Sequence, residues 1–466
     1  MTWKQRTSQH TPIRVETAAQ VSMQTQTACA HFGLIPHNSS DTKSKTTTPT
    51  DRVRNQILNN DIILITGHSG AGKSCLLRGI SESLKDHRVH IVSNQPIQST
   101  LSIFDLLTGT LKDRLATLSH AGLAEPKLWA RPFNTLSGGE QARFQLALTM
   151  QHARSGDFLA ADEFCTPLDR ISAHAIATTL RRWALRNNIT LIVATAHEDM
   201  KSLLCPSLVI DASTDTSHTL PPTKTVPTDI HIERGTIKDY QSLAHLHYRG
   251  PKPATHTLVL RALRSFPRTM PSQDPILAGV LVVSMPTLNG SWRERAWPGH
   301  FSGQSKAENA HRINRDLRCI SRVITDPRSR GLGVASSLVR AYLSNPQTPA
   351  TESIAAMGFV CPFLKRAGMT QYTIVASKDD LRLLDTLHHE QRTPSDLINR
   401  PIEPGSLLAR ELLRWGKSRK IISPQTEPHK ALQIIAPIAA CRLISKPRAY
   451  AHVFSQGATR DEFRDG

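Results

Sequence analysis

The feature that most constrains the fold is a glycine-rich octapeptide, residues 67 to 74, which reads Gly-His-Ser-Gly-Ala-Gly-Lys-Ser. It follows an apolar run at 62–65 and precedes apolar residues with helical spacing, which predicts a strand, a tight loop and a helix. Such a loop points backbone amides at an anion, while its lysine adds positive charge and its hydroxyl binds Mg²⁺. The sequence therefore predicts an α/β domain that binds a nucleoside triphosphate with Mg²⁺. The residues expected around the phosphates are Gly67, Ser69, Gly70, Ala71, Gly72, Lys73 and Ser74, of which Ser74 also binds the metal.

Two later segments occur in a fixed order with this loop. The first is Leu-Ser-Gly-Gly-Glu at 136–140, and the second is an apolar run at 158–161 that ends in two carboxylates. Together the three segments resemble the Walker A, signature and Walker B motifs of ABC-type ATPases. The resemblance implies ATP as the nucleotide and a homodimer, because each signature grips the γ-phosphate held by the partner subunit. The signature residues are Ser137, Gly138, Gly139 and Glu140.

The same resemblance assigns roles to the carboxylates. Asp162 would hold Mg²⁺ through water, and Glu163 would polarise the attacking water. Asp169 matches the D-loop, and His197, which follows an apolar strand, matches the switch histidine that contacts the γ-phosphate. Phe164 departs from the family pattern, in which a proline usually follows the glutamate.

The Q-loop glutamine is less sharply placed. Gln95 follows a short apolar run at 91–92 and is the first choice for a ligand of nucleotide-bound Mg²⁺, with Gln98 as its rival. The interval between Lys73 and Ser137 is short for a transporter, so we expect a reduced helical subdomain.

A second glycine-rich turn lies within 321–335, where a predicted strand ends at Pro327 and helical spacing begins at Val334. Glycines permit close backbone approach, and the new helix points its amides at an anion. The segment resembles the loop of GNAT-like N-acetyltransferases that holds the pyrophosphate of acetyl-CoA. The resemblance implies an α+β acetyltransferase-like domain whose pyrophosphate loop contains Arg328, Arg330, Gly331, Gly333 and Ala335.

This second motif also departs from its family. Leu364 stands where a tyrosine commonly protonates the departing thiolate. The candidates to replace that acid are Tyr248, Tyr372, Cys361 and Glu352. A carboxylate at Glu352 could also deprotonate an amine, so it is the candidate general base, with a surface or capping role as the alternative.

Polar stretches divide the chain into predicted parts. Residues 1–50 are rich in Thr, Ser and Gln and are expected to be disordered. The ATPase domain is placed at 51–212, a proline-containing linker at 213–228 and the acetyltransferase-like domain at 229–380. Residues 381–466 form a basic region with helical leucine spacing, to which no role is assigned.

Charge and composition indicate which class of partner and which cellular location to expect. A formal charge of +19 and a pI near 10.0 favour a polyanion, with nucleic acid as the first partner to test. No run reaches the roughly 20 apolar residues that cross a bilayer, so we expect no membrane insertion. Seven cysteines without a Cys-x-x-Cys pair fit reduced thiols and a cytoplasmic location.

These features combine into one leading hypothesis and two alternatives. The leading one is an ABC-type ATPase coupled to a GNAT-like acyltransferase that uses acetyl-CoA to modify a base amine of RNA or DNA. The first alternative is a nucleotide-dependent nucleic-acid clamp whose GNAT-like domain is not catalytic. The second is the ATPase subunit of a complex, with protein or small-molecule acetylation alongside.

Overall fold

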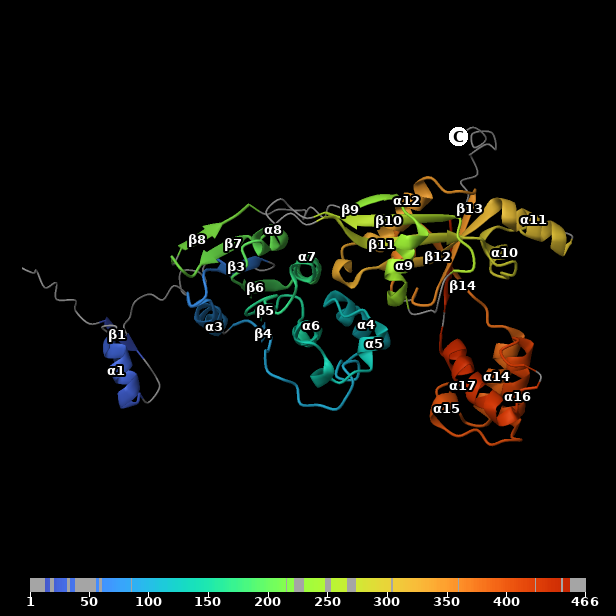
Figure 1. The fold of residues 1–466 in the computed structure, drawn as a ribbon, viewed down its shortest axis with the longest axis horizontal. Helices are drawn as coiled ribbons and strands as arrows, with labels where there is room; N and C mark the ends of the chain where they lie inside the picture. The colour runs from blue at the N-terminus through green and yellow to red at the C-terminus, as the bar shows by residue number, and fades with distance from the viewer. Residues whose placement is uncertain are drawn as a thin grey trace, which may run out of the picture. The chain divides into compact units, whose positions relative to one another are not determined.

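The structure is a computed structural model that describes residues 13–16, 21–31, 34–37, 56–57, 61–84, 86–214, 216–221, 230–247, 253–265, 274–302, 305–358, 360–423, 425–445 and 447–452 (Figure 1). Contacts within the chain separate two compact units, Met1–Asn55 and Gln56–Gly466. We refer to the described residues 61–221 as the first lobe and to the described residues 230–452 as the second lobe.

The N-terminal unit contains a strand, a helix and a strand. β1 (Ile13–Glu16) pairs in parallel with β2 (Leu34–His37), and α1 (Met23–His31) connects them. This differs from the disordered segment that polar composition predicted for 1–50. The remaining residues of that prediction, and most of the predicted linker at 213–228, lie outside the described residues.

The first lobe is built on a six-stranded sheet with the order β4-β5-β6-β3-β7-β8. Every pairing is parallel except β7 with β8, and the apolar strand of the glycine-rich loop, β3, lies between β6 and β7. Parallel strands covered on both faces read as continuous apolar runs, as β3, β5 and β6 do. The strands are β3 (Ile62–Thr66), β4 (Val89–Ile91), β5 (Phe158–Ala161), β6 (Thr190–Ala194), β7 (Leu208–Asp211) and β8 (Thr216–Thr219).

Helices complete the first lobe around two cores. One core packs β3, β5 and β6 against α6, α7 and α8, and the other lies among α4, α5 and α6. This second core belongs to the small helical subdomain that the short motif spacing predicted. The helices are α3 (Lys73–Ser83), α4 (Leu111–His120), α5 (Pro126–Trp129), η1 (Phe133–Thr135), α6 (Gly138–His152), α7 (Arg170–Asn187) and α8 (Met200–Leu204).

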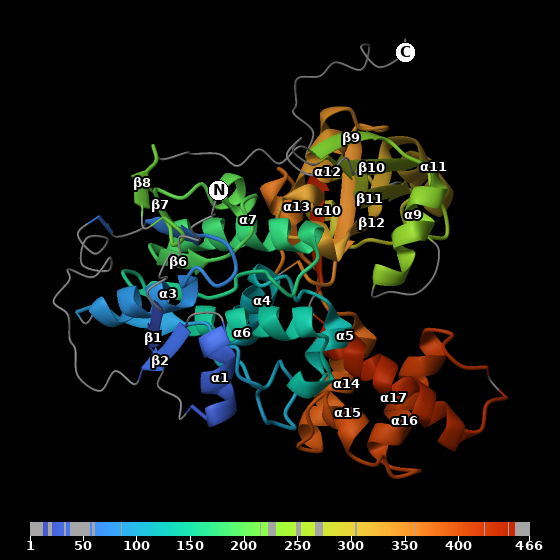
Figure 2. The same ribbon diagram turned by 60° about the vertical axis from the view of Figure 1, so that its left-hand side comes forward.

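The second lobe is built on a seven-stranded sheet with the order β14-β15-β13-β12-β11-β10-β9. Its strands are antiparallel to their neighbours except for β12 and β13, and Figure 2 shows β9 to β12 side by side. The strands are β9 (Ile230–Arg234), β10 (Leu258–Arg264), β11 (Ile276–Ser284), β12 (Leu317–Thr325), β13 (Ala350–Ala355), β14 (Thr370–Thr373) and β15 (Arg448–His452). The helices among them are α9 (Ile237–Leu243), η2 (Ala244–Leu246), α10 (Arg293–Ala296), α11 (Lys306–Asp316), η3 (Pro327–Ser329), α12 (Val334–Ser344) and α13 (Phe363–Arg366).

The parallel pair β12 and β13 separates along its length. Pairing joins Leu317–Cys319 to Ala350–Glu352 and then stops, although β12 continues to Thr325. A β-bulge next to this point, between Val282 and Val283 on the β11 side, shifts the register of β12. The backbone of Ile320–Thr325 therefore has no strand partner on its β13 side among the described residues.

The predicted boundary at residue 380 differs from the structure. α14 (Lys378–His389), α15 (Asp396–Asn399), α16 (Leu407–Ser418) and α17 (Pro428–Ile444) share one core, after which β15 returns to the sheet between β13 and β14. The helical region, expected as a C-terminal appendage, is instead an insertion within the second lobe. Local helical spacing predicted the helices, but strand pairing over so long a separation leaves no local signal.

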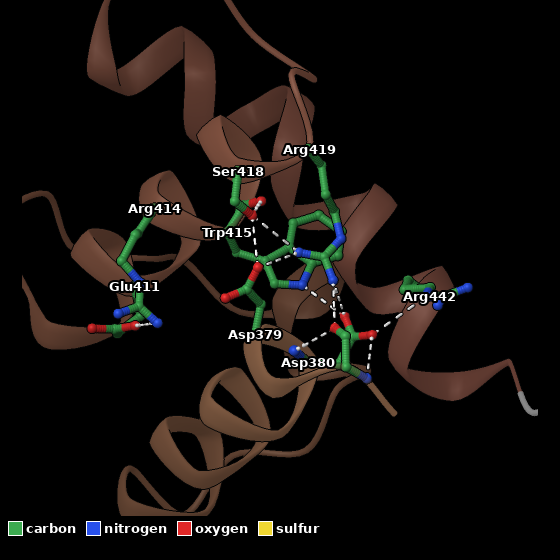
Figure 3. A network of polar contacts seen from close by, with 9 residues as sticks. Asp379, Asp380, Glu411, Arg414, Trp415, Ser418, Arg419 and Arg442 are labelled. Carbon is green, nitrogen blue, oxygen red and sulfur yellow. Dashed lines mark hydrogen bonds and ion pairs between the residues drawn. The ribbon is translucent and has the colours of Figure 1, made fainter. Parts of the chain in front are cut away.

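A buried carboxylate holds this helical insertion together (Figure 3). Asp380 of α14 accepts from Trp415 Nε1 at 2.9 Å and from Arg419 Nη2 at 2.7 Å, and Arg442 Nε of α17 lies 3.6 Å from its second oxygen. The Arg419 guanidinium lies over the Trp415 ring at 4.2 Å. One side chain thus joins three helices.

Among the described residues, no helix is both long enough and apolar enough to span a membrane.

Candidate functional site

The loop between β3 and α3 has the backbone that anion capture requires. Three of its glycines have positive φ, with Gly67 at 138°, Gly70 at 82° and Gly72 at 85°. Gly72 is the N-cap of α3, and no side chain caps the helix. Within the described residues the amides of residues 72 to 75 find no backbone acceptor. They remain available for phosphate oxygens.

The lysine of this loop turns back over it. Lys73 Nζ donates to the carbonyl oxygens of Gly67 at 2.9 Å and His68 at 2.8 Å. A residue that sequence reasoning missed also supports the loop, because the Ser213 hydroxyl accepts from the His68 amide at 3.3 Å. A Cβ on Gly67 would lie 2.8 Å from that hydroxyl oxygen, so glycine is required for this approach.

The predicted Mg²⁺ residue Asp162 and the predicted catalytic Glu163 follow β5, the second strand along the sheet from β3. The Glu163 amide donates to Asp162 Oδ1 at 2.9 Å, and both Glu163 and Cys165 have positive φ, at 47° and 62°. Left-handed backbone at non-glycine residues is uncommon and concentrates at functional sites. The turn therefore holds two carboxylates at the sheet edge where nucleotides bind in α/β proteins.

The structure explains why Phe164 replaces the family's proline. Its amide donates to the Ala194 carbonyl at the end of β6 at 2.9 Å, and its own carbonyl accepts from the Thr195 hydroxyl at 3.3 Å. A proline has no amide hydrogen to donate. The departure tightens the link between the Asp162 turn and the segment that carries His197.

His197 lies at the start of a polar network. Its amide donates to the Thr195 hydroxyl at 3.2 Å, and burial together with the charge of Arg170 lowers its pKa. Two residues later, Asp199 accepts from Arg170 and lies 2.8 Å from His174 Nε2. The predicted switch residue is thus joined to the first turns of α7, which sequence reasoning did not foresee.

The predicted signature segment begins α6. Ser137 and Glu140 form a reciprocal capping box, in which the Ser137 amide donates to Glu140 Oε2 at 2.8 Å. Ser137 and Gly138 are exposed, as a surface that meets a second subunit requires. A Cβ on Gly139 would lie 3.0 Å from Leu168, so this glycine lets the turn before Asp169 approach the signature helix.

The segment around Gln95 lies beside a cavity of about 380 Å³. The Gln95 carbonyl accepts from Gln145 Nε2 of α6 at 2.6 Å. The cavity is lined by Asn94, Asp162 and Glu163 among others, and the Gln95 side chain is not part of its lining. Asn94, rather than Gln95, thus lines the same cavity as the two carboxylates, and the Mg²⁺ role of Gln95 stays a prediction.

The loop between β12 and α12 repeats the backbone of the first loop. Gly331 and Gly333 have φ of 78° and 88°, and Gly333 is the N-cap of α12 without a side-chain cap. The described residues offer no backbone acceptor to the amides of residues 332 to 336, which include Ala335. Gly333 is exposed, and a Cβ on it would meet nothing within 4 Å. The loop therefore has amides without backbone acceptors and is open to solvent at Gly333.

The arginines of this second loop are already engaged. Arg328 donates through Nε and Nη2 to the two oxygens of the buried Asp326, at 3.0 and 2.8 Å. Arg330 is mostly buried and lies 3.7 Å from Glu125 of the first lobe. Burial lowers the pKa of the Arg330 guanidinium. Their predicted contact with a pyrophosphate would require these pairs to open.

Glu352 lies at the point where β12 and β13 separate, opposite Cys319 in the register. Its carboxylate is 2% exposed and accepts two hydrogen bonds from Arg293 of α10, at 2.8 and 2.7 Å. Burial raises the pKa of the neighbouring Cys319 thiol. Glu352 is therefore the partner of Arg293 in this structure, and its role as a general base stays a prediction.

The charge excess belongs to the second half of the chain. Residues 56–212 contain 15 Lys and Arg against 14 Asp and Glu, whereas residues 229–376 contain 19 against 9. The largest share of the positive charge excess thus lies in the second lobe. Trp292 and Trp297 are buried in a core cluster of the second lobe, so neither ring is exposed for stacking on a base.

Several solved structures of ATP-binding cassettes and ABC transporter proteins are similar to part of the chain. One is the dimeric post-hydrolysis state of the ATP-binding cassette MJ0796 bound to ADP and Pi, with 19% identity over 35% of this chain and 88% of that chain and a TM-score of 0.30. Another is cbiO1 from Clostridium perfringens, part of the ABC transporter complex cbiONQ, with 19% identity over 34% and 76% and a TM-score of 0.26. A bacterial Atm1-family ABC exporter with ATP bound matches with 19% identity over 33% of each chain and a TM-score of 0.27. No family model and no curated protein matches the chain.

Proposed function

We propose that the first lobe binds and hydrolyses ATP with Mg²⁺ as a homodimer. The support is the combination of free amides at Gly72, the adjacent Lys73 and the carboxylate turn of Asp162 and Glu163 at the same sheet edge. The amides and lysine fit a triphosphate, and Ser74 and Asp162 fit its Mg²⁺. The exposed signature at Ser137 and Gly138 supports pairing of two copies.

The second lobe is proposed to bind acetyl-CoA and to transfer its acyl group, as in GNAT-like acetyltransferases. One observation carries this proposal: a helix with free first-turn amides, α12, follows a strand whose edge is left open by the separation of β12 from β13. The amides fit a diphosphate, and the open edge of residues 323–325 fits the amide groups of a pantetheine arm. These are the two recognition elements that such a ligand needs.

Nucleic acid is the proposed acceptor. The net positive charge of residues 229–376 supports this choice, because it lies in the lobe that would carry the transfer rather than being spread along the chain. An exocyclic base amine is the acceptor group that this chemistry would modify.

One observation favours the alternative of a nucleic-acid clamp whose second lobe is not catalytic. Leu364 is 1% exposed in the core where a tyrosine acid would stand, and Glu352 is tied to Arg293. A lobe that binds acyl-CoA without an acid or base would act as a ligand-dependent binding module.

Labelled acetyl-CoA separates these functions. The purified protein is incubated with labelled acetyl-CoA, ATP and Mg²⁺, together with total RNA, DNA or protein in separate reactions. Enzyme-dependent label in RNA or DNA supports the proposed transferase. Label in protein alone would mean that protein, and not nucleic acid, is the acceptor. Measured CoA binding without label in any fraction supports the clamp.

A further inference from the structure

α7 belongs to both lobes. Its Ala173, Ile176 and Leu180 lie in the core of the first lobe, whereas Ala175 packs into the core of the second lobe with Leu332. A surface helix normally buries one stripe, but α7 buries residues around most of its circumference. Any displacement of α7 must therefore change the packing in the cores of both lobes.

The second-lobe face of α7 touches the predicted pyrophosphate loop directly. Arg182 Nη1 donates to the Gly331 carbonyl at 3.1 Å. A Cβ on Gly331 would lie 2.2 Å from the Thr179 hydroxyl oxygen. Glycine at position 331 is thus needed both for the close contact between the lobes and for the positive φ of the turn.

Arg264, at the end of β10, ties the same loop to the first turn of α7. Its Nη1 donates to the Arg328 carbonyl at 2.9 Å and to the Ile171 carbonyl at 3.4 Å. The residue is 4% exposed, and burial lowers the pKa of its guanidinium to about 10, so it stays charged at neutral pH. One buried cation therefore joins backbone groups of both lobes.

The other end of this connection is the nucleotide site. α7 begins at the predicted D-loop, where Asp169 Oδ1 accepts from the Ser172 amide at 2.9 Å. Arg170 and His174, both on α7, meet Asp199, two residues beyond His197. The two segments expected to sense ATP and the partner subunit are thus anchored on the first turns of α7.

These contacts also orient the second loop for an anion. Within a peptide unit the carbonyl and the following amide point in opposite directions. Arg182, which holds the Gly331 carbonyl from the α7 side, therefore turns the Leu332 amide away from α7. Ordering α7 lowers the entropy still to be lost when a ligand binds this loop.

We propose that α7 couples the two phosphate loops, so that ATP bound by the first lobe tightens the binding of acyl-CoA at the Gly331–Gly333 loop. Because coupling between two binding sites is reciprocal, acyl-CoA tightens ATP binding by the same factor. This rests on the proposed function of both lobes and adds to it the regulation of the second site. Arg182 and Arg264 act as positioning residues, since neither is required to touch a ligand.

The test is calorimetric titration of CoA into full-length Glu163→Gln protein, which holds ATP without turnover, with and without saturating ATP and Mg²⁺. We expect ATP to lower the Kd of CoA by about fivefold or more, and CoA to lower the Kd of ATP by the same factor. Arg182→Gln in this background should bring both ratios to within about twofold of one, and Arg182→Lys should restore part of the effect. Arg186→Gln removes the same charge one turn later on α7, from a side chain with no hydrogen bond to the loop among the described residues, and should leave the ratios unchanged.

Each result decides between the proposals. If CoA binds with a Kd that ATP leaves unchanged or raises, the coupling is wrong while the proposed acyl-CoA site stands. If ATP binds and CoA does not bind in either state, the proposed function of the second lobe is wrong and the coupling falls with it. Equal losses in Arg182→Gln and Arg186→Gln would overturn the assignment to the Gly331 contact, because they would make the effect one of charge alone.

Discussion

The loops before α3 and before α12 have similar glycine φ angles but differ in the residues that support them. Both helices are 11 residues long and begin after a left-handed glycine without a side-chain cap. The first loop carries its own cation, Lys73, whose hydrogen bonds among the described residues go to carbonyls of that loop. The second loop has its arginines bound to Asp326 and Glu125 and takes further support from the other lobe. The first is self-contained, whereas the second depends on its neighbour.

The largest expected effect tests the self-contained loop. Glu163→Gln should slow ATP hydrolysis by about 1000-fold, because the amide cannot polarise water, while ATP affinity changes little. Size-exclusion chromatography with ATP and Mg²⁺ should show a trapped dimer. Lys73→Ala is the contrasting variant, since it should lose ATP binding itself. Normal hydrolysis by Glu163→Gln would remove this residue from its role.

The next largest effect is expected from a steric test of the Gly331–Gly333 loop before α12. Gly331→Ala should cost about 3 kcal/mol in the free energy of unfolding, from its positive φ and the clash with Thr179. Gly333→Ala, with a similar φ and open space, should cost only about 1 kcal/mol. Denaturant unfolding measures both. Adding Thr179→Ala should recover part of the loss for Gly331→Ala alone, and equal costs for the two glycines would mean that the loop does not rely on α7.

A charge test follows. Ala335→Glu places a carboxylate in the first turn of α12, where it repels a diphosphate and should weaken CoA binding about tenfold while slightly stabilising the helix. Ser344→Glu makes the same charge change at the other end of α12, about 15 Å away, and should leave CoA binding unchanged. Calorimetry with CoA compares the two. Equal affinities in both variants would place the CoA site elsewhere.

The smallest expected effect is a pH dependence of stability that comes from His174 of α7. Burial lowers the pKa of His174 below its ordinary 6.5, although its bond to Asp199 opposes this. The unfolded chain therefore binds the proton more readily, so stability rises with pH toward neutrality and falls as pH drops through about 6.5. His174→Gln should remove about 1 kcal/mol or less of this dependence, measured as Tm between pH 5.5 and 7.5. An unchanged slope would assign the dependence to other groups.

How much was predictable from sequence depends on the separation of the interacting residues. Loop chemistry was predictable because phosphate capture needs glycines, a lysine and a hydroxyl at fixed local spacing, as at residues 67 to 74. The strand, loop and helix around both glycine loops follow the predicted order. The pair of Arg293 with Glu352, and the support of Gly331 by α7, could not be predicted, because residues distant in sequence supply the partners. Phe164 shows an intermediate case, where a departure from a family pattern was visible but its amide bond to Ala194 was not.

The late return of β15 has a consequence for how the chain is made. This strand pairs with both β13 and β14, yet the ribosome synthesises it only after the four helices of the insertion. Until it emerges, β13 and β14 present unpaired edges that invite association with other chains. The interior position of a late strand thus delays completion of this sheet, because the loop across the insertion must close first, and the unpaired edges are exposed to aggregation until then.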